Sequence, residues 1–134
     1  MIERSPPTAK ELASMYQNAD WISEPDLGQM TLAVNSSSEW FVARDTNKEI
    51  VGIGRFITDY ARYAFVVDVI VKESNRGQGI GSEIMLGIIS ECRRLGIASV
   101  NLWPSVGKVP FYERLGFYTL SSDQPHMKLR DEND

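Results

Sequence analysis

Apolar residues recur at helical spacing in three long stretches of the chain, and this spacing predicts three helices that each bury one face. The clearest stretch runs from Ser82 to Leu95, and Gly96 directly after it is a residue type that commonly ends helices. The other two helices are expected at Thr8 to Ala19 and Asp26 to Asn35, with a short fourth helix at Val109 to Leu115.

Apolar runs bounded by turn-forming residues predict the strands. Trp40 to Arg44 and Ile50 to Thr58 flank residues 45–48, whose composition favours a turn, so the two segments are expected to form a hairpin. Phe65 to Val71 is a nearly continuous apolar run interrupted by Asp68. The order of helices and strands predicts an α/β fold, an α+β sandwich with a mixed sheet. Further strands are expected at Ile97 to Trp103, Phe117 to Leu120 and Met127 to Leu129.

The composition indicates a small protein with a single hydrophobic core. The chain has 134 residues, of which 43% are hydrophobic, and we expect one domain over residues 1–130 followed by a disordered acidic tail at residues 131–134. No apolar run approaches the roughly 20 residues that span a membrane, and the first residues contain no signal-peptide core. The expected location is the cytoplasm.

Charge and cysteine content argue against several classes of function. The formal net charge is -4 and the pI is near 5.0, so the basic surface of a nucleic-acid-binding protein is not expected and a cationic partner is favoured. Cys92 is the only cysteine, which excludes an internal disulfide and a zinc site built from several cysteines. We expect no metal site.

A glycine-rich turn lies between the strand that ends at Val71 and the helix that begins near Ser82. The first amides of a helix have no carbonyl partner and lie at the positive end of the helix dipole, so they bind anions well. Glycines permit the positive φ angles that direct successive amides to one point, and Arg76 adds a cation suited to phosphate oxygens. The turn therefore predicts a ligand with a diphosphate or polyphosphate group. It reads Arg76-Gly77-Gln78-Gly79-Ile80-Gly81.

Spacing separates three kinds of phosphate-binding loop. A Walker loop requires a lysine after its last glycine, and none follows Gly81. A dinucleotide-binding loop requires Gly-x-Gly-x-x-Gly, but Ser82 or Ile84 stands where the third glycine would fall, which leaves this loop as a minor alternative. The remaining pattern, Arg/Gln-x-x-Gly-x-Gly, is satisfied by Arg76, Gly79 and Gly81. It resembles the acetyl-coenzyme A loop of the GCN5-related N-acetyltransferase (GNAT) family.

A second segment resembles another signature of this family, a helix-borne Phe-Tyr followed by Leu-Gly-Phe. The resemblance covers roughly Phe41 to Leu129 and implies a mixed, mostly antiparallel sheet with helices on both faces. The family usually opens with a strand before its first helix. Only Met1 to Arg4 could form that strand in this chain, so it is expected to be short or absent. The segment reads Phe111-Tyr112-Glu113-Arg114-Leu115-Gly116-Phe117.

The resemblance also implies how acetyl-coenzyme A, the expected co-substrate, is bound. In the family, the strand before the glycine loop splays away from the strand after the next helix, and the pantetheine arm lies between the two. The residues expected at the cofactor are Val69, Ile70, Val71, Arg76, Gly77, Gln78, Gly79, Ile80, Gly81, Ser82, Phe111 and Tyr112.

Acetyl transfer to an amine requires that the amine lose a proton and that the coenzyme A thiolate gain one. Tyr112 matches the family's tyrosine that donates a proton to the leaving sulfur, and aromatic packing is the alternative. Asp68 is a lone charge in an apolar strand, which costs folding free energy unless it is paired or functional. It is a candidate base; an ion pair with Arg55 or Arg62 is the competing explanation, and a water chain could replace a dedicated base. The candidates for binding the acceptor are Asp59, Tyr60 and Trp103.

Three functions remain open at the level of the sequence. The leading one is an N-acetyltransferase that acts on a primary amine of a small molecule, such as an amino sugar or a polyamine, by direct attack in a ternary complex. The alternatives are a protein lysine or N-terminal acetyltransferase and a non-catalytic acyl-coenzyme A-binding module. A homodimer is compatible with the leading function, because a second copy can help to close an acceptor pocket.

Overall fold

The computed structural model describes residues 2–19, 25–36 and 39–133. The chain divides into two compact units, residues 1–102 and 103–134, and the first contains one sheet. Its strands are β1 (Ile2–Glu3), β2 (Glu39–Arg44), β3 (Ile50–Thr58), β4 (Tyr63–Val71) and β5 (Ser99–Leu102). They lie in the order β1-β2-β3-β4-β5, and every neighbouring pair is antiparallel except the parallel pair of β4 and β5. The mixed, mostly antiparallel sheet is confirmed, and its first strand is short as expected.

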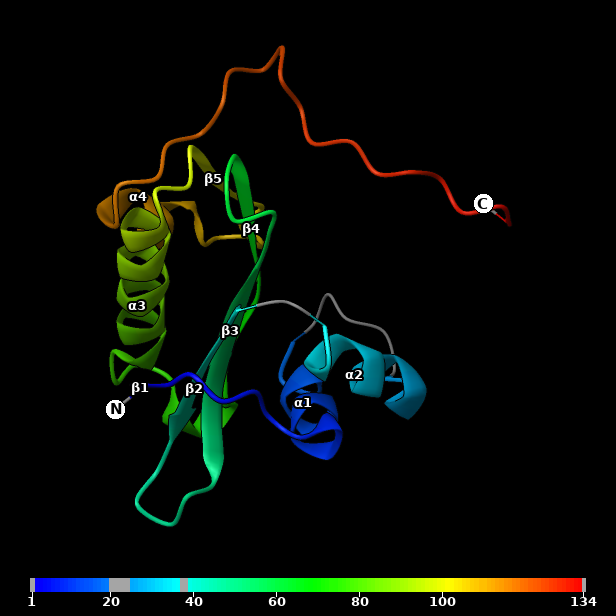
Figure 1. Ribbon diagram of the computed structural model, residues 1–134, viewed down its shortest axis with the longest axis vertical. Coiled ribbons are helices and arrows are strands. Elements are labelled where there is room, and N and C mark those ends of the chain that lie inside the picture. Colours follow the sequence, from blue (N-terminus) through cyan, green and yellow to red (C-terminus); the bar gives the residue numbers. More distant parts are fainter. Residues whose placement is uncertain (1, 20–24, 37–38, 134) are drawn as a thin grey trace. The chain divides into compact units, whose positions relative to one another are not determined.

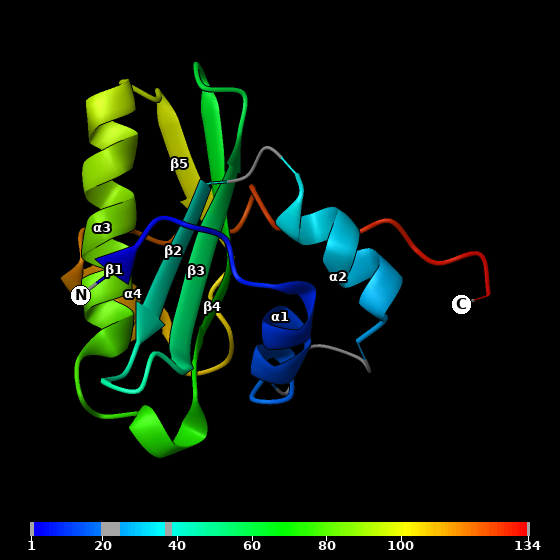
Figure 2. The same ribbon diagram turned by 60° about the horizontal axis from the view of Figure 1, so that its bottom comes forward.

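Helices cover both faces of the sheet, as predicted (Figures 1 and 2). On one face lie α1 (Ala9–Tyr16) and α2 (Leu27–Val34), and on the other lies α3 (Ile80–Leu95). A short 3-10 helix, Glu73–Asn75, lies in the connection between β4 and α3. The first unit is therefore a three-layer sandwich, and the glycine-rich turn connects its central layer to one outer layer.

Local sequence signals set the ends of these helices. A capping box starts α1, in which Thr8 Oγ1 accepts from the Glu11 amide at 3.1 Å and the Glu11 carboxylate accepts from the Thr8 amide at 3.0 Å. Asp26 Oδ1 accepts from the Gly28 amide at 2.8 Å at the start of α2. Gly96 ends α3 with a φ angle of 69°, as predicted for a C-terminal glycine.

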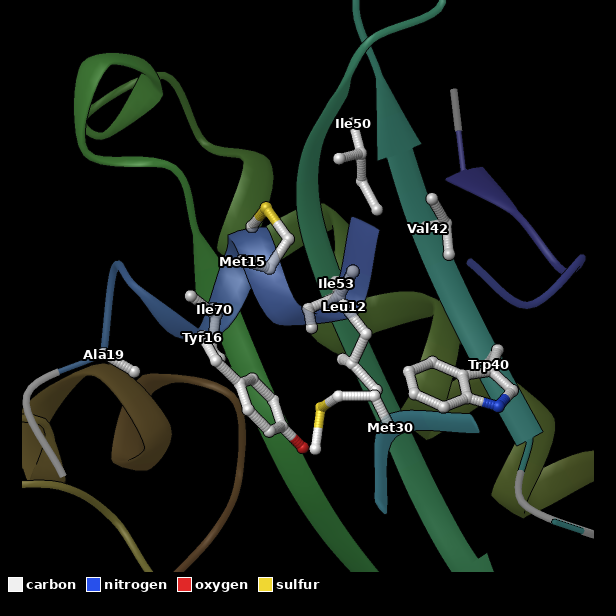
Figure 3. Close-up of a cluster of buried hydrophobic side chains, with 10 residues drawn as sticks. All are labelled: Leu12, Met15, Tyr16, Ala19, Met30, Trp40, Val42, Ile50, Ile53 and Ile70. Atoms are coloured by element: carbon white, nitrogen blue, oxygen red, sulfur yellow. The ribbon is translucent and has the colours of Figure 1, made fainter. Parts of the chain in front are cut away.

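A hydrophobic core lies on the face of the sheet that α1 and α2 cover (Figure 3). Trp40 pairs with Arg55 and Val42 pairs with Ile53 across β2 and β3, so these side chains share that face. Burial of a large apolar side chain contributes about 1.5–3 kcal/mol, so this core holds α1 firmly against the strands. The buried members are Leu12, Met15, Tyr16, Ala19, Met30, Trp40, Val42, Ile50, Ile53 and Ile70.

On the opposite face, two glycines of β3 let α3 approach the sheet closely. A Cβ added at Gly54 would lie 2.6 Å from Ile84 Cγ2, and one added at Gly52 would lie 2.8 Å from Ile80 Cγ2. Carbon atoms in packed proteins rest at about 3.5–4.0 Å, so a side chain at either position would displace the helix. These two glycines therefore set the distance between α3 and the sheet.

We expect Gly54→Ala to lower the free energy of unfolding by about 1–3 kcal/mol, the usual cost of overpacking a well-packed core. The added methyl group meets Ile84 in the middle of α3, where the helix cannot yield without losing contacts along the sheet. Chemical denaturation measures the effect. A denaturation midpoint equal to that of the wild type, with an unchanged m-value, would contradict this account of the contact.

The two strands predicted at Phe117 to Leu120 and Met127 to Leu129 are wrong, because both segments lack regular secondary structure. The side chains of Tyr118, Met127 and Leu129 are 80%, 85% and 90% exposed. A strand is stable when its backbone pairs with a neighbouring strand and its apolar side chains are covered. The residue types favoured extended structure, but neither condition is met along these segments.

Candidate active site

The glycine-rich turn has the predicted left-handed geometry at two of its three glycines, while Gly81 lies within α3 and has no positive φ angle. Gly77 and Gly79 have φ angles of 81° and 82°, in the left-handed region where other residues are strained. The helix that follows begins at Ile80, two residues earlier than the predicted start at Ser82. The end of the glycine motif therefore forms the first turn of α3.

This first turn leaves amide donors without a helical partner. Gly79 precedes α3 and provides no side chain to cap it, while its carbonyl accepts from the Glu83 amide at 3.0 Å. The first amides of α3 thus point along the helix axis at its positive end. No atom outside the adjacent residues lies within 4 Å of the position that a Cβ would take on Gly77 or Gly79. An anion has open space beside the turn.

Arg76 was predicted to be a phosphate-binding cation, and its guanidinium group has two partners within the protein. Nε donates to the carbonyl of Val71 at 3.1 Å, and Nη2 donates to the carbonyl of Asn18 at 2.7 Å. Val71 is the last residue of β4, and Asn18 follows the C-terminus of α1. The side chain therefore connects the glycine-rich turn with α1, a contact that the sequence did not indicate.

A bulge interrupts β4 next to this turn. Between two regular pairs of β3 and β4, Asp68 and Val69 lie opposite the single residue Gly54. Asp68 has a φ angle of 57°, in a region that aspartate and asparagine tolerate better than most residues with side chains. The bulge changes the direction of the strand just before the turn.

The pairing of β4 with β5 ends just before the bulge. Their pairing runs from Tyr63 with Ser99 to Val66 with Leu102, and no further pair of these strands follows among the described residues. The edge of β4 that faces β5 is therefore without a strand partner along residues 67–71. The resemblance implied that the two strands splay apart here, and this stays a prediction, because β5 itself ends at Leu102.

Asp68 accepts two hydrogen bonds on the face of the sheet that α1 covers. The hydroxyl of Tyr16 donates to Oδ2 at 2.7 Å, and Arg55 Nε donates to the same oxygen at 2.9 Å. The ion pair is mostly buried, since the side chains of Arg55 and Asp68 are 12% and 13% exposed. Asp68 thus forms the ion pair that was considered as an alternative, and its partner is Arg55. The guanidinium group of Arg62 lies over the ring of Tyr63 instead.

Two aromatic residues surround this ion pair. Burial, together with the charge of Asp68, raises the pKa of Tyr16 well above its usual value, so the hydroxyl stays protonated and donates. The ring of Trp40 lies 5.0 Å from the guanidinium group of Arg55. Its buried Nε1 has no hydrogen-bond partner within the part of the chain that the structure describes. Helical spacing placed Tyr16 on a buried face, but nothing in the sequence indicated the partner of its hydroxyl.

Asp59 and Tyr60, which were expected to bind the acceptor, form the turn between β3 and β4. Asp59 Oδ1 accepts the amides of Tyr63, Ala61 and Arg62 at 3.0, 3.0 and 2.9 Å. These backbone hydrogen bonds, the largest effect coming from Tyr63, lower the pKa of the Asp59 carboxyl group. Tyr60 donates its hydroxyl to Glu39 Oε2 at 2.8 Å. Both residues stabilise the turn between β3 and β4, and their contact with an acceptor stays a prediction.

The second unit carries the predicted proton donor. Its helix α4 (Val109–Arg114) lies where a short helix was expected. The ring of Tyr112 meets the rings of Phe111 and Phe117 edge-on, with centroids 4.9 and 6.0 Å away. Burial raises the pKa of Tyr112, so its phenol is protonated at neutral pH.

Part of the predicted site lies in the first unit, and Phe111, Tyr112 and Trp103 lie in the second. Asp68, residues 69–71 and residues 76–82 lie along one stretch from the bulge to the first turn of α3. Trp103 belongs to the second unit, where its ring stacks on His126 with centroids 4.4 Å apart.

Other kinds of site find no support among residues 2–19, 25–36 and 39–133. No three His, Cys, Asp or Glu side chains of these residues gather as metal ligands would. No helix among them is long and apolar enough to cross a membrane. Cys92 is buried, and burial raises the pKa of its thiol to about 11, so it is not a nucleophile at neutral pH.

The mixed sheet, with helices on both faces and a glycine-rich turn before α3, matches the architecture that the resemblance implied. The acetyltransferase (GNAT) family matches residues 3–117, and the chain belongs to this family. The uncharacterised N-acetyltransferase ycf52 of Pyropia yezoensis is 27% identical over 110 residues, which are 80% of this chain and 63% of that protein. Histone acetyltransferase TAP1 of Glycine max is 31% identical over 70 residues, which are 52% of this chain and 30% of that protein.

A solved structure shows the same fold over nearly the whole chain. The protein comes from methicillin-resistant Staphylococcus aureus and is described as a probable acetyltransferase. Its TM-score is 0.88 at 22% identity, with 98% of each chain covered, and at that identity it shows the fold alone. The chain spans only 63% and 61% of the length of the ycf52 proteins from Pyropia yezoensis and Gracilaria tenuistipitata var. liui.

Proposed function

We propose that the chain is an acetyl-coenzyme A-dependent N-acetyltransferase that acts on a primary amine of a small molecule by direct attack in a ternary complex. One observation carries the proposal: an uncapped glycine turn starts α3, and it follows β4, whose edge toward β5 has no strand partner along residues 67–71 among the described residues. The turn suits the pyrophosphate of a coenzyme, and the unpaired strand edge suits its long flexible arm. Membership of the GNAT family supports acetyl transfer as the reaction.

The proposed cofactor site uses mainly backbone groups. Amides from Gly77 to Ser82 donate to the pyrophosphate, and the backbone of residues 69–71 bonds the pantetheine arm along the unpaired edge of β4. The open space beside Gly77 and Gly79 fits this arrangement, because a side chain there would separate the amides from the phosphates. When bound, acetyl-coenzyme A supplies the acetyl thioester.

The proposed acceptor site centres on Asp68. Tyr16 and Arg55 both donate to Oδ2, which orients the carboxylate and leaves Oδ1 to a further donor. In this proposal that donor is the amine of the acceptor. The formal net charge of -4 favours a cationic acceptor such as an amino sugar or a polyamine.

Release of coenzyme A from acetyl-coenzyme A in the presence of a panel of amines tests this proposal. Amino sugars, polyamines, amino acids and lysine peptides are each mixed with acetyl-coenzyme A, and the freed thiol is measured. We expect turnover with a small cationic amine. Turnover with peptides alone would identify a protein acetyltransferase, and tight binding of coenzyme A without turnover of any amine would identify a binding module. Failure to bind coenzyme A would refute the assignment of the cofactor site.

Tyr112→Phe is expected to lower kcat about tenfold, with little change in coenzyme A affinity. This is below the roughly 100- to 10,000-fold range of general acid catalysis, because a thiolate is already a tolerable leaving group. The raised pKa of Tyr112 keeps the phenol protonated up to pH values above its usual range near 10, so the wild-type rate should fall only at higher pH. The variant should lack this alkaline decrease.

The exposed Tyr118 offers a matched control for this variant, since Tyr118→Phe deletes the same atom elsewhere in the second unit. It should leave kcat unchanged. Full activity of Tyr112→Phe over the whole pH range would assign Tyr112 to packing.

A further inference from the structure

The end of α1 is tied to the connection between β4 and α3 through Asn18. The carbonyl oxygen of Asn18 accepts from Arg76 Nη2 at 2.7 Å, and its side-chain Oδ1 accepts from the Glu73 amide at 3.0 Å. The Asn18 amide group also donates through Nδ2 to the carbonyl of Ser14 at 3.4 Å, which helps to orient Oδ1 toward Glu73. Asn18 therefore contacts both ends of the segment from Glu73 to Arg76, which directly precedes the glycines.

Arg76 has the geometry of a clamp between two backbone segments. Its Nε bonds the carbonyl that ends β4, and its Nη2 bonds the carbonyl of Asn18 beyond α1. A planar guanidinium group serves two acceptors in fixed directions, whereas a lysine ammonium supplies the same charge without this fork. Gly77 and Gly79 follow immediately, and since glycine adopts left-handed angles without strain but is equally free to leave them, contacts next to the turn favour one conformation.

We propose that Asn18 and Arg76 are positioning residues that hold the glycine-rich turn in its ligand-binding conformation, and that Arg76 acts through this clamp rather than through its charge on the phosphate. This proposal rests on the proposed function in that it takes coenzyme A as the ligand of the turn. The same end of α1 carries Tyr16, which bonds Asp68, so one helix end positions the cofactor turn and the acceptor carboxylate.

Substitutions of Arg76 and Asn18 distinguish the hydrogen-bonding role of Arg76 from the effect of its charge. Arg76→Lys keeps the charge and loses the fork, and Arg76→Ala loses both. Asn18→Ala removes the acceptor for the Glu73 amide, while Asn18→Asp retains it. Asn75→Ala is the matched control, because Asn75 lies in the same turn and its side chain bonds only the hydroxyl of Ser74 among the described residues.

Two measurements are made on each variant. Amide hydrogen exchange of residues 72–79 without ligand reports the order of the turn, and calorimetry with coenzyme A reports affinity. We expect faster exchange in Arg76→Lys, Arg76→Ala and Asn18→Ala, with coenzyme A affinity lower by about threefold to tenfold, as the loss of one or two hydrogen bonds implies. Asn75→Ala should resemble the wild type in both measurements, and Asn18→Asp, which keeps the acceptor for the Glu73 amide, should exchange more slowly than Asn18→Ala.

Near wild-type affinity of Arg76→Lys, together with a large loss in Arg76→Ala, would show that charge on the phosphate is what matters and would overturn the proposal. Unchanged hydrogen exchange in Asn18→Ala would overturn it as well. The exchange measurement needs no ligand. A wild-type protein that failed to bind coenzyme A would therefore refute the proposed function, while the exchange data would still decide whether Asn18 and Arg76 order the turn.

Discussion

Gly79→Val is expected to weaken coenzyme A binding by about 100-fold or more, the equivalent of losing one or two charge-assisted hydrogen bonds of about 1.5–3 kcal/mol each. Gly79 has a φ angle of 82°, which a β-branched residue adopts only with strain of about 1–3 kcal/mol. Its added side chain would also occupy the open space beside the turn. Calorimetry with coenzyme A measures the loss directly.

The other end of α3 supplies the control for this prediction. Gly96 has a φ angle of 69° and nothing within 4 Å of its added Cβ, so Gly96→Val introduces similar strain far along the same helix. Both variants should lose similar stability in thermal denaturation. Only Gly79→Val should lose the ligand, and equal affinities in the two variants would reject the cofactor assignment.

Asp68→Asn is expected to lower kcat/KM for the acceptor about 100-fold, as loss of a charge-assisted hydrogen bond implies, with coenzyme A affinity unchanged. Asparagine tolerates the φ angle of 57° at this position, so the backbone of the bulge should be retained. Activity should recover partly at high pH, where more of the acceptor amine is neutral. Steady-state kinetics over a pH series, measured with an amine found in the panel, provide the readout.

The same variant should also be less stable. Removal of one charge of a mostly buried ion pair should cost about 3 kcal/mol in free energy of unfolding, because the Arg55 guanidinium group loses its charge-assisted hydrogen bond to Asp68. Glu11→Gln is a suitable control, because it breaks the more exposed pair between Glu11 of α1 and Arg44 of β2. It should cost about 1 kcal/mol or less and leave kcat/KM unchanged. A stable and fully active Asp68→Asn protein would reject both roles of Asp68.

The glycine-rich turn was predictable because its chemistry is local. Left-handed φ angles at Gly77 and Gly79 and the start of a helix directly after them follow from residue types a few positions apart. The helix ends at Thr8 and Gly96 were predictable for the same reason. The start of α3 was predicted two residues too late, because left-handed Gly79 can itself precede a helix that begins at Ile80.

The partners of the charged residues were not predictable in the same way. Asp68 is bonded by Tyr16, 52 positions away, and Arg76 by the carbonyl of Asn18, 58 positions away. These contacts depend on how α1 packs on the sheet, and a backbone carbonyl carries no signature in the sequence. Residue types alone could not distinguish a phosphate-binding Arg76 from one that bonds two carbonyls.

The sequence by itself determined which segments form helices and strands in residues 1–102, and where the glycine-rich turn would lie. It determined these features because helical spacing, apolar runs and glycine conformations are properties of neighbouring residues. Only the tertiary structure decided that β4 bulges at Asp68, that its pairing with β5 ends at Val66, and that Phe117 to Leu120 forms no strand. Strand pairing depends on a partner from elsewhere in the chain, and a segment's own residues can favour extended structure without providing that partner.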